Sequence, residues 1–122
     1  MNTLDLLLNL DPPELPEKEV KIKRLSELCG GDVIIKLRAL SYNRVAEIKS
    51  MKNKSEMSAH ILLAGCVSSE FSSKELMDKY KVFTPVDLIK AMLLPGEIED
   101  LSSEVERLSG YMELNCEEIK KK

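Results

Sequence analysis

Residues 91–111, AMLLPGEIEDLSSEVERLSGY, carry the signals of one helix whose two ends are both marked. Pro95 stands where a preceding helix must end, because its ring blocks continued helix and it has no N–H to donate. Glu97, Glu99 and Asp100 then place negative charge in the first turn, where the helix dipole favours it. Gly110 is the expected left-handed stop. The stretch therefore predicts a helix over about 96–109.

The apolar residues of this helix fall on one face. Ile98, Leu101, Val105 and Leu108 follow one another at spacings of 3, 4 and 3 residues, which makes a single helical stripe. We expect this stripe to lie in the core. No catalytic group is evident on the helix, so the segment specifies packing without chemistry, which is typical of a binding or assembly protein.

The composition fits one small domain built mainly on aliphatic packing. The chain has 122 residues, five of them aromatic and none a tryptophan, so Leu, Ile, Val and Met must fill the core. Charged residues make up 32% and hydrophobic residues 43%, which argues against wholesale disorder. No apolar run is long enough to span a membrane.

The cysteines do not indicate a disulfide framework or a metal site. Cys29, Cys66 and Cys116 are odd in number, and no two of them form a CxxC pair. We expect a reducing cytoplasm, with no metal and no cofactor. The apolar beginning of the chain has no basic residues ahead of it, so it does not resemble a signal peptide.

The net charge of −3 is unevenly spread. Residues 18–54 carry ten Lys and Arg against four Asp and Glu, whereas residues 55–119 carry five against thirteen. These balances of +6 and −8 have two interpretations. They are either two solvated faces, or surfaces that steer partners of opposite charge.

The first 17 residues form an apolar leader and a proline-rich linker ahead of a domain over 18–122. Thr3–Leu10 predicts a short helix capped by Thr3, and residues 11–16, DPPELP, predict a stiff, extended linker. The leader either packs on its own domain or engages a partner or a second copy. Its candidate partner-binding residues are Leu4, Leu6, Leu7, Leu8 and Leu10.

A β-hairpin is predicted after the linker. Apolar and basic residues alternate in Glu19–Leu25 and again in Asp32–Leu40, and residues 29–32 supply turn chemistry. In the second strand, Val33, Ile35, Leu37 and Ala39 are expected to share the buried face. The basic positions of the hairpin form a second candidate partner surface: Lys21, Lys23, Arg24, Lys36 and Arg38.

The rest of the chain predicts short helices, which makes the fold class mainly α. About five to six short helices, besides the leader, accompany the one N-terminal hairpin in a single small domain. The predicted helices run from Ser41 to about Met51, from Ser55 through Val67, over 74–80 with Ser73 as cap, over 85–92 with Thr84 as cap, over 96–109 and over about 113–120.

Catalytic groups are not evident. His60 is the single histidine, and its neighbours one turn away, Met57 and Ala64, cannot act with it, so we interpret it as a core or edge residue. Carboxylates cluster on the last long helix at Glu97, Glu99, Asp100 and Glu104. This cluster is either an acid–base pair or divalent-ion site, or an exposed acidic helix face, and we favour the face.

A small helical DNA-binding regulator is the alternative function, and it would use the basic stretch 18–54. Phosphate contacts would make its affinity fall steeply with salt. Tyr42 is the only aromatic residue inside the stretch, whereas a stacking surface uses several rings. We therefore do not expect nucleic acid as a partner.

In order and motif, the chain resembles the XkdN-like tail assembly chaperones of contractile-tailed phages and prophages. An apolar leader precedes the basic strand Glu19-Val-Lys-Ile-Lys-Arg-Leu25, and the second strand ends in Arg38-Ala39-Leu40 before a helix. The closing block begins Leu88-Ile-Lys-Ala-Met-Leu-Leu-Pro-Gly-Glu97. Its family-motif structural residues are Leu94, Pro95, Gly96, Glu97, Leu101, Leu108, Gly110 and Tyr111.

The resemblance implies a non-catalytic chaperone. Such proteins hold the long tape-measure protein while tail tube subunits polymerise around it. The resemblance thus implies the tape-measure protein as partner, with the tail tube protein as another candidate. It also implies a place in the host cytoplasm and absence from the mature virion.

Family members are also commonly made in a second, longer form by ribosomal frameshifting. A frameshift-extended form of this chain is thus a third candidate partner. The closing lysines, 120–122, would provide a slippery run if their codons are mostly AAA. The nucleotide sequence tests this, because AAG codons and no open downstream frame would remove the idea.

Overall fold

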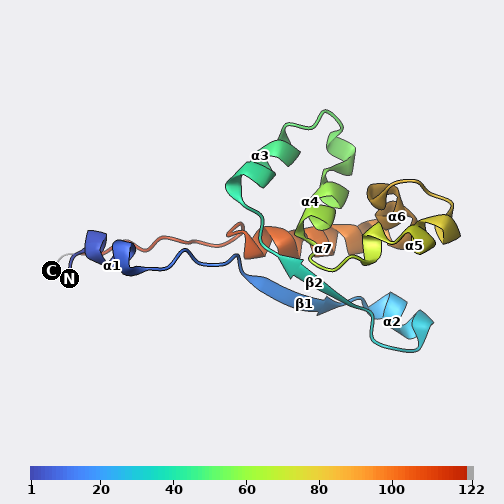
Figure 1. Ribbon diagram of the computed structural model, residues 1–122, viewed down its shortest axis with the longest axis horizontal. Helices are drawn as coiled ribbons and strands as arrows, with labels where there is room; N and C mark the ends of the chain where they lie inside the picture. Colours follow the sequence, from blue (N-terminus) through green and yellow to red (C-terminus); the bar gives the residue numbers. More distant parts are fainter. Residues whose placement is uncertain (121–122) are drawn as a thin grey trace.

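The computed structural model describes residues 1–120, which fold into seven α-helices, two strands and two short 3-10 helices (Figure 1). In chain order these are α1 (Thr3–Asn9), β1 (Glu17–Lys21), α2 (Lys23–Cys29), β2 (Ile34–Arg38), α3 (Tyr42–Lys49), η1 (Lys54–Glu56), α4 (Met57–Gly65), η2 (Glu70–Ser72), α5 (Lys74–Tyr80), α6 (Pro85–Met92) and α7 (Pro95–Leu108). The mainly helical class with one two-stranded sheet is confirmed.

Helix α7 runs through the domain and is bounded as its sequence predicts. Pro95 is its first residue, and the carboxylate of Glu97 accepts a hydrogen bond of 2.7 Å from the Leu94 N–H. At the other end Gly110 has a φ of +95°, and Gly110 and Tyr111 donate N–H bonds of 3.0 Å back into the last turn. A residue with a Cβ would be strained at this φ, which is why glycine ends the helix.

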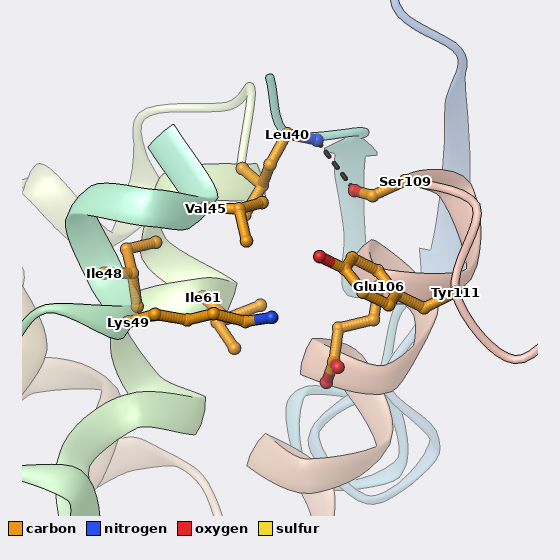
Figure 2. A pocket seen from close by; sticks show the side chains of 8 residues that line it. All are labelled: Leu40, Val45, Ile48, Lys49, Ile61, Glu106, Ser109 and Tyr111. Carbon is orange, nitrogen blue, oxygen red and sulfur yellow. Dashed lines mark hydrogen bonds between the residues drawn. The ribbon is translucent and has the colours of Figure 1, made fainter. Parts of the chain in front are cut away.

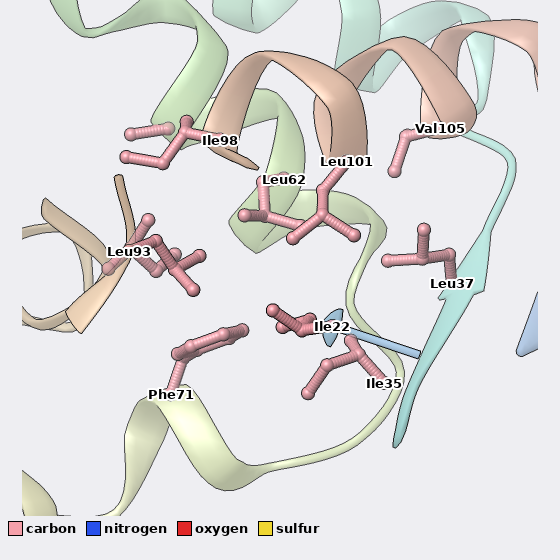
Figure 3. Close-up of a cluster of buried hydrophobic side chains, with 11 residues drawn as sticks. Ile22, Ile35, Leu37, Leu62, Phe71, Leu93, Ile98, Leu101 and Val105 are labelled. Atoms are coloured by element: carbon pink, nitrogen blue, oxygen red, sulfur yellow. The ribbon is translucent and has the colours of Figure 1, made fainter. Parts of the chain in front are cut away.

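The apolar stripe of α7 lies in the core, as predicted. Ile98, Leu101 and Val105 are buried and Leu108 is half-buried against the same cluster. Figure 3 shows Ile98, Leu101 and Val105 facing residues contributed by the sheet, α4, η2 and the end of α6. The labelled members besides the stripe are Ile22, Ile35, Leu37, Leu62, Phe71 and Leu93.

Helix α4 crosses α7 at very short range, and Gly65 makes the crossing possible. A Cβ on Gly65 would lie 2.5 Å and 2.6 Å from the two methyl carbons of Val105, and 3.1 Å from the Arg38 carbonyl oxygen. No side chain fits there without displacing a neighbour. The glycine therefore sets how closely α4, α7 and β2 approach one another.

The two strands pair antiparallel, with Glu17 opposite Arg38 and Lys21 opposite Ile34. Along β2, Ile35 and Leu37 are buried, and the predicted buried face also includes Ala39 and a half-buried Val33. The edge of β2 that does not pair with β1 is partly covered, because Leu37 forms an isolated bridge with Cys66.

The predicted strand over Glu19–Leu25 is wrong in its second half. The strand ends at Lys21, and residues Lys23–Cys29 form α2, so a helix replaces the end of the predicted strand and the residues that lead into the predicted turn. The Ser26 hydroxyl donates to the Ile22 carbonyl at 2.8 Å and accepts from the Val33 N–H at 2.9 Å. These two bonds fold α2 back against the entry to β2, a tertiary effect that local alternation could not reveal.

Three predicted helix caps are confirmed and two are wrong. Ser41, Ser73 and Thr84 each accept a hydrogen bond from a backbone N–H in the first turn of the next helix. In the leader, however, Asn2 caps α1 and Thr3 is already helical. Ser55 lies within η1, and the α-helix begins only at Met57. In the leader, the neighbouring Asn2 is better placed to cap the helix than Thr3. Before α4, a short 3-10 turn takes up Ser55 ahead of the first α-helical residue.

The predicted helix over about 113–120 is also wrong, because the structure has no helix there. Leu114 is 95% exposed and Ile119 82% exposed, so the apolar side chains of the segment have no surface to pack on. The segment has neither a packing surface nor the reciprocal Asn2–Asp5 cap that begins α1, so a helix this short is not stable in water. Of the closing lysines, 121–122 lie outside the described residues.

Candidate partner-binding surfaces

The leader stands away from the domain at the end of its linker (Figure 1). Its helix begins with a reciprocal cap, since Asp5 donates its N–H to the Asn2 side chain at 2.8 Å and Asn2 donates to the Asp5 carboxylate at 3.4 Å. No residue of α1 is buried. The five candidate leucines, Leu4, Leu6, Leu7, Leu8 and Leu10, are each between 59% and 71% exposed.

The leucines of α1 form a broad apolar arc around the helix. At 100° per residue Leu7 lies near the middle of this arc, with Leu4 and Leu8 to one side, whereas Asp5 and Asn9 share the opposite face. An exposed arc of this size is more apolar surface than an idle tail carries. It has the pattern of a helix that lays one face into a groove.

Most of the basic hairpin residues are engaged inside the domain. Glu17 pairs with both Lys36, at 3.2 Å, and Arg38, whose Nε donates to the same carboxylate at 2.6 Å. Arg38 first, and then Lys36, lower the pKa of the Glu17 carboxyl. Lys21 lies 3.6 Å from Asp32. These pairs hold the outer face of the sheet together.

An ion pair joins Arg24, which was predicted to bind a partner, to Glu97, which was predicted to be a structural residue. The Arg24 guanidinium donates to the Glu97 carboxylate at 2.8 Å and 3.1 Å, and to the Met92 carbonyl at 3.0 Å. It therefore ties α2 to the junction of α6 and α7. Lys23, its neighbour, is exposed and forms no ion pair within residues 1–120, so it remains the freest basic residue of the hairpin.

The Arg24–Glu97 ion pair, which we call the clamp, predicts that the free energy of unfolding depends on pH. The Arg24 side chain, followed by the Leu94 N–H, holds the pKa of Glu97 below its ordinary value of 4.5. A carboxyl with a depressed folded-state pKa stabilises the fold above its unfolded pKa, and this contribution disappears as the pH falls through the folded value. We expect the free energy of unfolding to fall as the pH decreases below about 4.5, the ordinary pKa of the carboxyl.

Glu97→Gln tests the clamp, because glutamine keeps an acceptor for the Leu94 N–H but loses the charge. At pH 7 the variant should be less stable by about 1 kcal/mol, the typical difference between charged and neutral hydrogen bonds. Urea unfolding at a series of pH values measures the difference, and the two proteins should become equally stable as the pH falls through the lowered pKa of Glu97. Equal stability at pH 7 would contradict the role of the charge.

An apolar hollow lies between α3, α4 and the end of α7 (Figure 2). We call it the α3–α4–α7 hollow. The Lys49 ammonium is 5.2 Å from the centre of the Tyr111 ring, and the Leu40 N–H donates to the Ser109 hydroxyl at 2.8 Å beside it. Its lining residues are Leu40, Val45, Ile48, Lys49, Ile61, Glu106, Ser109 and Tyr111.

Sequence reasoning did not find this hollow. The spacing of Val45 and Ile48 predicts an apolar face on α3, and Ile61 lies on the apolar helix α4, but their convergence depends on tertiary packing. Tyr111 was predicted only as a structural residue of the family motif. Its ring adds the side of the hollow opposite α3 (Figure 2).

The structure also shows the ion-pair partners of the acidic face of α7 and of the single histidine. Glu97 binds Arg24, while Glu104 lies 2.5 Å from Lys18 and 2.8 Å from Arg107. His60 lies 3.8 Å from Glu56, which also pairs with Lys90. Within residues 1–120 no three His, Cys, Asp or Glu side chains gather in a way that could hold a metal ion.

A family model and a solved structure each match nearly the whole chain. The sequence model of the phage XkdN-like tail assembly chaperone protein family matches residues 4–120. The crystal structure of the protein YqbN is similar with a TM-score of 0.68 at 22% sequence identity, covering 91% of this chain and 98% of that one. No curated protein sequence is significantly similar. In the described part of the chain, no helix has the length and apolar character needed to cross a membrane.

Proposed function

The chain belongs to the phage XkdN-like tail assembly chaperone family, and we propose that it binds the tape-measure protein and keeps it available while the tail tube assembles. The family is non-catalytic, so the function lies in surfaces. The observation that carries the proposal is the leader, whose five leucines are exposed on a helix and its C-cap, held away from the domain.

The chemistry of the leader suits a long helical partner. A tape measure is expected to expose apolar seams before the tube encloses it, and an amphipathic helix can cover such a seam. Residues 1–17 contain Asp5, Asp11, Glu14 and Glu17 and no Lys or Arg. We therefore infer that the partner seam is apolar with basic residues along its edges.

The chaperone must also release its partner, and a short helix favours release. One turn or two of apolar contact gives modest affinity, so stable coverage requires several copies along one tape measure. The stiff linker supports this arrangement, because it keeps the domain clear of neighbouring copies.

Co-expression tests the proposal. We expect the tape-measure protein to become soluble and to co-purify with the chain, whereas expressed alone it should aggregate. Co-expression with a variant that carries serine at Leu4, Leu7 and Leu8 is the matched control. A tape measure that gains no solubility and brings down no band with the wild-type chain would contradict the proposal.

Protein partners suit the hairpin better than nucleic acid does. Lys21, Lys36 and Arg38 are each paired with an acidic side chain, which reduces the positive charge that the hairpin offers to phosphates. The tail tube protein and a frameshift-extended form of the chain remain further candidate partners. We place the encounter in the host cytoplasm, before the virion is complete.

A further inference from the structure

Strand β1 has one edge without a partner. The sheet has the order β1–β2, and in the described part of the chain no other strand pairs with β1. The Ala39 N–H donates to the Pro16 carbonyl at 2.9 Å, and at the other end of β1 the Ile22 N–H donates to the Val33 carbonyl at 3.0 Å. Because hydrogen-bonded positions alternate along an antiparallel pair, every second residue of β1 bonds to β2 and the residues between them face away from it. The N–H and C=O groups that point outward at the free edge are those of Glu17, Glu19 and Lys21.

This free edge is complementary to itself. When two copies of β1 run antiparallel with Val20 opposite Val20, Glu19 of each copy lies opposite Lys21 of the other. Glu19 and Lys21 are also residues whose backbone groups point outward, so each facing pair can exchange both of its N–H to C=O bonds. We propose that two copies of the chain pair along β1 in this register and form one continuous sheet around a twofold axis.

The charged side chains at the edge favour this pairing. Glu19 is exposed and forms no ion pair within residues 1–120, since Lys36, which lies opposite it on β2, pairs with Glu17 instead. Lys21 has only a distant partner, Asp32 at 3.6 Å, and both of these side chains are more than half exposed. In the proposed pair, each Glu19 therefore gains an opposite charge directly across the new strand boundary.

Val20 lies at the twofold axis of the proposed pair. Its side chain is half-buried against the core, opposite Ile35 of β2. Residues that face each other at a non-hydrogen-bonded position bring their Cα atoms to about 4.5 Å, so the two Val20 side chains cover each other's exposed surface. An inward-pointing lysine on an edge strand usually opposes such pairing. Here Lys18 lies 2.5 Å from Glu104, so its charge is already paired inside its own copy.

Strand pairing also determines where the two leaders lie. Each leader precedes its own β1, and the two β1 strands run in opposite directions, so the leaders leave the shared sheet at opposite ends (Figure 1). The contact is short, and we therefore expect a reversible dimer. The pairing does not rest on the identity of any other partner, because both edges belong to this chain.

Charge exchange between full-length variants tests the register. Glu19→Lys and Lys21→Glu each place like charges opposite one another, so sedimentation should show the dissociation constant of each homodimer raised about tenfold relative to the wild type. An equal mixture of the two variants should restore the dimer, because every facing pair then has opposite charges. Lys52→Glu, in the segment after α3, makes the same change in net charge as Lys21→Glu and should leave dimerisation unchanged.

Amide hydrogen exchange of the wild type is a second measurement that needs no substitution. With rising protein concentration the Glu19 and Lys21 N–H groups should exchange more slowly. The Glu17 N–H should not, because in this register it faces the first residue of α2 in the other copy. A wild type that is monomeric even at millimolar concentration overturns the proposal. So does a dimer that both charge variants leave unchanged, or a mixture that is no tighter than either variant alone.

The result is separable from tape-measure binding. Glu19→Lys and Lys21→Glu lie outside the leader, so these variants should still capture a tape measure even though they dimerise poorly. Loss of the dimer with capture retained supports both ideas. A dimer without capture supports the pairing along β1 and removes the proposed function.

Discussion

Gly65→Ala should destabilise the domain by about 2 to 3 kcal/mol, near the upper range for overpacked cores, and lower its melting temperature by roughly 8 to 12 °C. The added Cβ would lie 2.5 Å from a Val105 methyl carbon, well inside contact distance. Val105 is fully buried and cannot turn away without losing its own packing. The Arg38 carbonyl oxygen, 3.1 Å from the added Cβ, belongs to the backbone and can move even less than the Val105 side chain.

A double-mutant cycle identifies the cause. Val105→Ala alone should cost about 2 kcal/mol through the buried methyl groups it removes. In that background Gly65→Ala should cost at least about 1 kcal/mol less than in the wild type, because the nearest clash is gone. Gly96→Ala is the matched control, since a Cβ there meets nothing within 4 Å. Strictly additive costs would show that the crossing of α4 and α7 is not the reason.

The second large effect is expected in partner binding. Replacing Leu4, Leu7 and Leu8 together by serine should weaken capture of the tape measure by about a hundredfold or more, because each leucine that enters a groove is worth about 1.5 to 3 kcal/mol. Thermal unfolding of the domain should be unchanged, since none of these side chains is buried. Calorimetric titration with a tape-measure segment measures the affinity.

Leu28→Ser is the control for nonspecific loss of apolar surface. Leu28 is 72% exposed, like the leader leucines, but lies on α2 at the other end of the sheet (Figure 1). It should leave capture unchanged. Equal losses in both variants would show that exposed leucines act without regard to position, which would contradict a specific role for α1.

The sequence predicted those parts of the fold whose signals are local. Pro95, Gly110 and the stripe of α7 act within one helix, and the caps at Ser41, Ser73 and Thr84 depend on the next turn of backbone. Each could therefore be predicted without knowing what lies across the core.

The parts that were missed depend on contacts across the chain. Residues 23–29 form a helix because Ser26 bonds to both ends of the connection, and Arg24 is fixed by Glu97, far along the sequence. The hollow likewise requires α3, α4 and α7 to meet. The failed helix over 113–120 shows the reverse case, since its local pattern was adequate but it has no surface to pack on.

The ion pair between Lys18 and Glu104 has a consequence for synthesis on the ribosome. It joins residues 86 positions apart, and α7 also completes the core around β2 and α4. The domain therefore cannot close until its last helix has emerged, whereas the leader emerges first and folds with a local cap of its own. A nascent chain would thus display its leucines throughout translation, before the rest of the domain has closed.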